Sequence, residues 1–95
     1  MKTNELYEQM GKFSIETFPE ADSIDHLKKL QSETIEAIQA PKDIYEYADC
    51  LLCIFGAAYK AGFSYGELKL AIETKLYINQ NRNWEKLEDG TYQHI

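Results

Sequence analysis

Apolar residues recur at helical spacing in four separate stretches of this chain. Pro19 ends the first stretch, Pro41 lies at the expected start of the third, and Gly62 is its expected left-handed cap. Ser64 and Glu67 have the spacing of a capping box, which starts the fourth. The pattern predicts an all-α protein, an antiparallel four-helix bundle-like protomer in one domain over residues 1–95, with helices at about 4–18, 23–39, 41–61 and 64–82 and an irregular tail at 83–95.

The second expected helix has two unlike faces when its residues are placed at the helical angle. Its main apolar stripe consists of Ile24, Leu27, Gln31, Ile35 and Ile38. A polar stripe on the other side consists of His26, Lys29, Glu33 and Glu36. Such a stripe is typical of a face in contact with water, so for this helix alone a solvated face is the simplest interpretation.

The third expected helix is apolar nearly all round, which predicts a central helix buried on most sides. After Asp43 its only acids are Glu46 and Asp49. A carboxylate on a buried helix needs a cation, a hydrogen-bond donor or a proton. These two acids therefore favour a functional site over a solvated face.

The acids form two pairs with the same spacing, Glu33 with Glu36 and Glu46 with Asp49, and Pro41 lies between them. Residues three apart lie on one face of a helix. On two antiparallel helices that turn near Pro41, both pairs would sit at similar distances from the turn. Four carboxylates at close range repel one another unless cations hold them, so we expect a divalent-metal site, with Mg²⁺ as the ion and Mn²⁺ as an alternative.

Length and charge narrow the classes of function. A chain of 95 residues buries a modest core, which makes oligomerisation a natural supplement. A formal charge of −6 argues against binding to nucleic acid or to an anionic membrane. The first residues are too polar for a secretory signal, and no apolar run is long enough for a membrane span, so we expect a cytoplasmic protein.

Polar groups elsewhere suit a phosphate ligand. Lys75, Asn79 and Arg82 fall on or near the apolar face of the fourth helix, where they either extend toward solvent or line a polar cavity. A nucleoside triphosphate would be repelled by this acidic protein unless Mg²⁺ bridged its phosphates to carboxylates and a Lys or Arg neutralised the rest. Lys29 is a further candidate for that role, and no P-loop is present.

Other residues allow two interpretations. His26 is either a substrate contact or a histidine at the surface or in support of its neighbours. Trp84 is either a platform for a base or a packing residue. Cys50 and Cys53 have no second pair with which to complete a zinc site, which favours two core thiols.

The order of the motifs resembles the MazG-like all-α nucleoside triphosphate diphosphohydrolases, and most of all the small phage and prophage dATP/dGTP type. The core signature of that family is E-x-x-E followed on the next helix by E-x-x-D, as in Glu33, Glu36, Glu46 and Asp49. The stretches at 16–21, 26–29, 75–84 and 89–95 are similar too, so the resemblance covers nearly the whole chain.

The resemblance implies a helical homodimer or homotetramer with Mg²⁺-dependent cleavage between the α and β phosphates. By motif position, the four acids would hold the metal and position the attacking water, with Glu33 or Glu36 as the general base. Lys75, Asn79 and Arg82 would contact the phosphates, and Lys29, His26 and Trp84 are further candidates for substrate contacts. Purine deoxynucleotides are the expected substrates. The alternatives are a dUTP-directed enzyme of the same helical group and a non-catalytic acidic interaction module.

Overall fold

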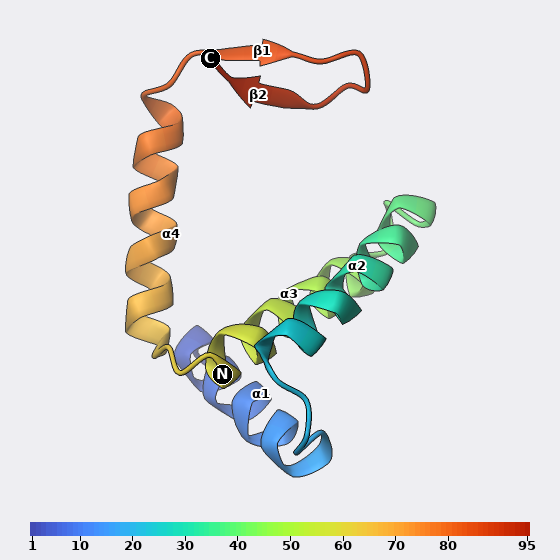
Figure 1. The fold of residues 1–95 in the computed structure, drawn as a ribbon, viewed down its shortest axis with the longest axis vertical. Coiled ribbons are helices and arrows are strands. Elements are labelled where there is room, and N and C mark those ends of the chain that lie inside the picture. The colour runs from blue at the N-terminus through green and yellow to red at the C-terminus, as the bar shows by residue number, and fades with distance from the viewer.

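A computed structural model describes all residues from 1 to 95 and contains four helices followed by two short strands (Figure 1). The expected all-α class is confirmed. No helix combines the length and the apolar character that a membrane span requires. The elements are α1 (Thr3–Thr17), α2 (Ser23–Gln39), α3 (Ile44–Lys60), α4 (Tyr65–Gln80), β1 (Trp84–Lys86) and β2 (Tyr92–His94).

Reciprocal hydrogen bonds fix the starts of α2 and α4. The Asp22 carboxylate accepts from the backbone N–H of Asp25, and the Asp25 carboxylate accepts from that of Asp22. Ser64 and Glu67 make the same exchange ahead of α4. Each of these capping boxes satisfies two N–H groups that a helix start leaves free. The first residues of α2 and α4 are therefore fixed by residues that are neighbours in the sequence.

The start of α3 differs from the one expected at residue 41. Pro41 lies in the turn between α2 and α3, where its carbonyl accepts a hydrogen bond from the Tyr47 hydroxyl at 2.8 Å. Asp43 is the N-cap, and its side chain accepts from the backbone N–H of Tyr45 at 3.0 Å. The expected start was wrong because the helix begins after its cap and not at the nearest proline.

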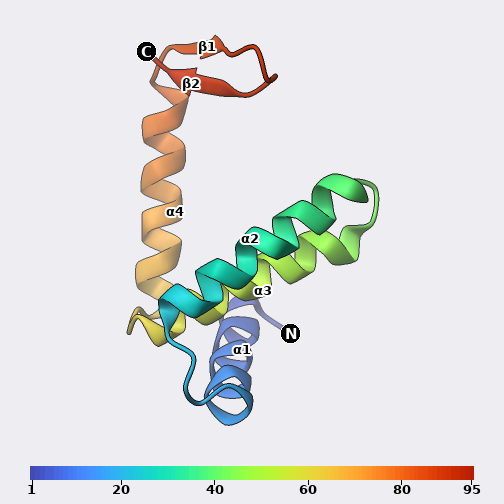
Figure 2. The ribbon, with the colours of Figure 1, turned by 45° about the vertical axis from the view of Figure 1, so that its right-hand side comes forward.

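Three of the helices pack together, and the fourth stands apart. α2 and α3 form the most extensive helix pair, and α1 packs across the C-terminal half of α3. Gly62, at a φ of +92°, ends α3 and redirects the chain. α4 then runs away from the other helices and carries the two strands at its far end, as both views show (Figures 1 and 2). The four helices therefore do not close into a bundle within one chain.

The tightest packing lies between α1 and α3. Tyr7 is fully buried, and its hydroxyl donates to the Phe63 carbonyl at 2.7 Å. Its ring meets those of Phe55 and Tyr59 on α3, with centroids 5.4 and 5.7 Å away. Gly11 lies against Tyr59 so closely that a Cβ at position 11 would overlap the ring. This contact fixes how α1 crosses α3.

Burial on α2 is the reverse of what its sequence pattern predicts in the simplest interpretation. The buried residues of α2 are His26 and Glu33, both from the polar stripe, which is therefore not a solvated face as a whole. The apolar residues Ile24, Leu27, Ile35 and Ile38 are between 48% and 72% exposed. The third helix also departs from its prediction, because only Gly56 and Ala57 of α3 are buried.

The last residues form a hairpin, so the expected irregular tail was wrong. β1 and β2 pair antiparallel, with Trp84 opposite His94. The turn contains Gly90 at a φ of +91°, and Asp89 Oδ1 accepts bonds from both the N–H and the hydroxyl of Thr91. Strands of three residues are too short to give a periodic pattern, although the Asp-Gly pair is a turn signal.

Candidate metal centre

Three carboxylates converge where α2 lies against α3. Glu33 on α2 and Glu46 and Asp49 on α3 can each offer one oxygen such that all three oxygens lie within 4.8 Å of one another. The antiparallel pairing of α2 and α3 about the turn at Pro41 is what brings them together. The group contains only oxygen ligands, which suits a hard divalent cation.

Two of these carboxylates carry an oxygen without a partner. Glu33 Oε2 and Glu46 Oε2 are buried and make no hydrogen bond. A buried, unpaired carboxylate oxygen is costly, because it has lost water and gained nothing in return. A cation between α2 and α3 would remove that cost at both oxygens, so the residues present fit a divalent metal.

The fourth acid lies at the edge of this group. Glu36 is exposed, and the adjacent carboxyl of Glu33 raises the pKa of the Glu36 carboxyl, first by competing for a shared proton and then by its negative charge. Glu36 and then Lys29 lower the pKa of Glu33. The pKa of Glu46 is raised first by desolvation and then by Asp43 and Asp49. Desolvation and neighbouring negative charges act to raise the pKa values of Glu36 and Glu46, whereas the positive charge of Lys29 acts to lower that of Glu33.

Lys29 is the cation beside the carboxylates. Its Nζ lies 3.2 Å from Glu33 Oε1, one helical turn away, while 64% of its side chain stays exposed. The bond to Glu33 raises the pKa of Lys29. The ammonium is therefore charged, and it is free enough in solvent to move toward another anion.

His26 lies two turns before Glu33 on the same face of α2. Its Nε2 is 2.6 Å from Ser14 Oγ, only 7% of the residue is exposed, and the ring lies against Gly56 of α3. Burial lowers the pKa of His26, and the charge of Lys60 lowers it further. The histidine is thus a neutral residue at the junction of α1, α2 and α3.

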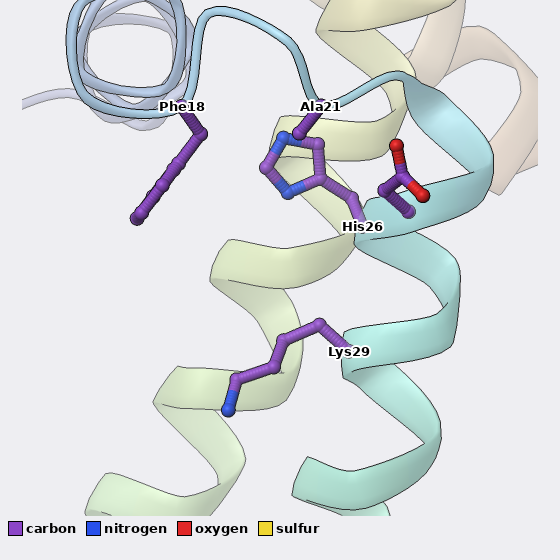
Figure 3. A pocket seen from close by; sticks show the side chains of 5 residues that line it. Phe18, Ala21, His26 and Lys29 are labelled. Carbon is purple, nitrogen blue, oxygen red and sulfur yellow. The ribbon is translucent and has the colours of Figure 1, made fainter.

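A cavity of about 230 Å³ opens beside His26, at the link between α1 and α2. In Figure 3 the ring of Phe18 and the ring of His26 face this space from opposite sides, and Lys29 lies below them. Neither Ser14 nor Phe18 was among the expected site residues. Phe18 lies in the stretch 16–21 that resembles the family, which was the one available signal, whereas Ser14 belongs to no motif. The lining consists of Phe18, Ala21, Asp25, His26 and Lys29.

The residues expected from the C-terminal third lie elsewhere in this chain. Lys75 is exposed on α4, and Arg82 Nη1 is 3.4 Å from His94 Nδ1 on β2. Trp84 donates its indole N–H to the Asn79 carbonyl at 2.9 Å and meets the His94 ring edge to face. No hydrogen bond or ion pair joins α4 or the hairpin to α2 or α3. Within one chain these residues do not reach the carboxylates.

The two cysteines take no part in these contacts. Cys50 and Cys53 are free thiols of intermediate exposure on α3. Burial raises the pKa of Cys53, and the negative charge of Glu33 acts in the same direction. A raised pKa keeps the thiol protonated, which is the opposite of what a reactive cysteine needs.

Comparison with known proteins identifies relatives. The dATP/dGTP pyrophosphohydrolase family matches residues 6–95. A dATP/dGTP diphosphohydrolase of Salmonella phage PMBT28 is 35% identical over 80 residues, which is 83% of this chain and 27% of that protein. This chain therefore spans about a quarter of the length of that relative.

Among solved structures, a MazG-like pyrophosphohydrolase of cyanophage S-2L is similar along the whole chain. The TM-score is 0.82 and the identity is 27%, with 100% of this chain and 98% of that chain covered. That structure holds dGDP and three catalytic Mn²⁺ ions per active site. From the match over residues 6–95 and the identity to the phage protein, the chain belongs to the dATP/dGTP pyrophosphohydrolase family, a group of hydrolases with the MazG-like all-α fold.

Proposed function

We propose that this protein hydrolyses purine deoxynucleoside triphosphates between the α and β phosphates, releasing a deoxynucleoside monophosphate and pyrophosphate in the cytoplasm. The observation that carries the proposal is the convergence of Glu33, Glu46 and Asp49, with two buried oxygens that lack partners. The name of the family and the dGDP held by the cyanophage relative support the substrate class.

We assign the ion to Mg²⁺, with Mn²⁺ as the alternative that the cyanophage relative favours. Glu33, Glu46 and Asp49 would hold the ion, and Glu36, which lies beside Glu33, is a further candidate ligand. When bound, the ion activates a water and neutralises charge on the phosphates. Without a cation the carboxylates would repel the triphosphate as well as one another.

The general base comes from the first acidic pair, Glu33 or Glu36. We assign the role to Glu36, because it lies outside the converging group and its raised pKa is closer to neutral pH. Glu33 is the weaker base, since Lys29 and Glu36 lower its pKa. Glu36 would take a proton from the water that attacks the α phosphorus in line with the departing pyrophosphate.

The polar face of α2 would set the orientation of the substrate, with the phosphates near the carboxylates and the base or sugar near His26. Lys29 lies between the carboxylates and the cavity beside His26, so it suits a phosphate oxygen. A cavity of about 230 Å³ is smaller than the roughly 300 Å³ or more of pockets for whole drug-sized ligands. It therefore suits the base or the sugar alone, with Phe18 as a stacking surface and His26 as a wall.

Lys75, Asn79 and Arg82 remain our candidates for further phosphate contacts, since an ammonium, an amide and a guanidinium all donate to phosphate oxygens. Trp84 is less suited to a base, because its indole N–H already bonds to Asn79. The exposed apolar stripe of α2 supports a homodimer or homotetramer.

The proposal is tested by pyrophosphate release from dATP, dGTP, dCTP, dTTP and dUTP with Mg²⁺ or Mn²⁺. We expect turnover of the two purine nucleotides, loss of turnover with EDTA, and loss in Asp49→Asn. Turnover that survives both EDTA and Asp49→Asn would refute the metal site. Preference for dUTP would favour the dUTP-directed alternative. A protein that neither hydrolyses any triphosphate nor melts at a higher temperature with Mg²⁺ would be the interaction module instead.

A further inference from the structure

One wall of the cavity beside His26 belongs to no helix. Phe18 and Ala21 line the cavity from the link between α1 and α2, and Phe18 is 44% exposed. The last turn of α1 and the capping box of α2 hold the two ends of this link. Between the ends, a single backbone bond of 3.1 Å joins the Ala21 N–H to the Phe18 carbonyl. The link therefore does little to hold its own middle in place.

Lys60 reaches this link from the last turn of α3. Its Nζ donates to the Phe18 carbonyl at 2.9 Å and to the Ala21 carbonyl at 2.8 Å. No other residue of α3 or α4 forms a hydrogen bond or an ion pair with residues 18–22. A hydrogen bond from a charged donor is stronger than one between neutral groups. Lys60 is thus the contact through which α3 fixes the backbone of the link.

The opposite wall of the cavity is fixed without the link. His26 is buried, and its Nε2 is 2.6 Å from Ser14 Oγ on α1. Its ring also lies against Gly56 of α3, where an added Cβ would come within 3.2 Å of the ring. Three helices therefore set the position of the His26 ring, whereas the position of Phe18 depends on the link.

The separation of the two rings decides what they can hold. The ring centroids of Phe18 and His26 are 6.3 Å apart, and both rings face the cavity (Figure 3). Aromatic contacts need centroids within roughly 4.5–7 Å of each other. The Phe18 ring also meets Phe13, but Phe13 is 50% exposed and leaves room for movement. A link released from Lys60 would let the Phe18 ring move out of contact with a base.

We propose that Lys60 is a positioning residue for the purine base: by binding the carbonyls of Phe18 and Ala21, it holds the Phe18 ring against the base in the cavity. The inference rests on the proposed function for the identity of the ligand, a purine nucleotide. Lys60 does not line the cavity, so its effect on the ligand passes through the link. The rival interpretation is a lysine that stabilises the fold and has no effect on the base.

Binding of dGMP in EDTA tests the base contact without metal or turnover. Lys60→Met keeps a long side chain and removes the donors, and Lys60→Arg retains N–H donors. In NMR titrations we expect affinity for dGMP about tenfold lower in Lys60→Met, because binding must then order a released link. Lys60→Arg should recover most of the wild-type affinity. Equal affinities of the wild type and Lys60→Met, or no binding of dGMP to the wild type, would overturn the proposal.

A substrate without a base shows whether the effect is specific to the base. The probes are dGTP and the triphosphate of deoxyribose that carries no base, each with Mn²⁺. In Lys60→Met the KM for dGTP should rise about tenfold, while the KM for the base-free triphosphate and both kcat values stay unchanged. A general loss of structure would affect both substrates alike. Equal rises of the two KM values would therefore overturn the proposal.

A double-mutant cycle tests the route through Phe18. Phe18→Leu removes the ring, so adding Lys60→Met to it should weaken dGMP binding little further. Fully additive losses would exclude this route. Lys12→Met is the matched control, because Lys12 is an exposed lysine of α1 that makes no ion pair. Its affinity for dGMP should equal that of the wild type, and circular dichroism should show the same helical content in every variant.

The two kinds of failure are distinguishable. A wild type that binds dGMP, loses affinity in Lys60→Met and releases no pyrophosphate from any triphosphate would refute the proposed hydrolysis and keep the role of Lys60. A wild type that hydrolyses dGTP with the same KM as Lys60→Met would keep the hydrolysis and refute the role of Lys60.

Discussion

At the scale of single residues, the carboxyl group of Glu46 links stability to metal binding. Its Oε2 is buried without a partner, and desolvation raises its pKa. Glu46→Gln removes the buried charge, so we expect a higher melting temperature without metal and a smaller rise on adding Mn²⁺. Calorimetry with EDTA and with Mn²⁺ measures both. A variant with an unchanged Mn²⁺ shift would exclude Glu46 as a ligand.

The raised pKa of Glu46 also sets a pH dependence. A folded state that holds this proton more tightly than the unfolded chain gains stability as pH falls from neutral toward the ordinary carboxyl pKa, and loses it as pH rises. His26, with its lowered pKa, acts in the opposite direction at acid pH. The difference in melting temperature between wild type and Glu46→Gln isolates the first effect. Without metal, that difference should grow as pH rises from the ordinary carboxyl pKa through the raised pKa of Glu46.

Gly11 tests the contact between α1 and α3. A Cβ at this position overlaps the Tyr59 ring, so Gly11→Ala should lower the free energy of unfolding by about 1–3 kcal/mol. Gly66→Ala is the matched control, since a Cβ there meets only Ser64 Oγ at an ordinary 3.8 Å. That change should be neutral or stabilising within a helix. Urea unfolding measures both free energies, and equal stabilities would contradict the close packing of Gly11 against Tyr59.

At the scale of elements, the helices are predictable where their signals are local. The capping boxes at Asp22 and Ser64 can be read from neighbouring residues, and so can the turn at Gly90. Which face of α2 is buried cannot be read from the sequence. A helical wheel shows that Ile38 is apolar but not which surface covers it. The same limit applies to Ser14, whose bond to His26 joins two helices and leaves no motif.

The hairpin is held to α4 by one side-chain bond that can be removed. Trp84→Phe keeps a ring but deletes the bond from the indole N–H to the Asn79 carbonyl. We expect amide hydrogens of β1 and β2 to exchange faster, by an amount equivalent to about 1 kcal/mol, with those of α1 to α3 unchanged. Tyr92→Phe, which removes a hydroxyl on the same hairpin, is the control. Equal exchange in the two variants would contradict this anchoring.

At the scale of the whole molecule, the carboxylate motifs predicted a convergence on α2 and α3, and Glu33, Glu46 and Asp49 do converge. The position of α4 was not predictable, because its apolar face reads the same whether its own chain or another copy covers it. Ile38 tests the proposed homodimer or homotetramer, because 72% of this residue is exposed in one chain. Ile38→Asp should shift sedimentation toward the monomer with helical content preserved, while Lys28→Asp should not. An unchanged oligomer would exclude this face as an interface.

In the proposed function, these carboxylates hold the ion with which the protein cleaves a purine deoxynucleotide between its α and β phosphates. The most direct measurement is ³¹P NMR of dGTP incubated with the protein and Mg²⁺, beside the same reaction with Asp49→Asn. We expect dGMP and pyrophosphate in equal amounts with the wild type and unchanged dGTP with the variant. Release of dGDP and phosphate, or the same products at the same rate from Asp49→Asn, would contradict it.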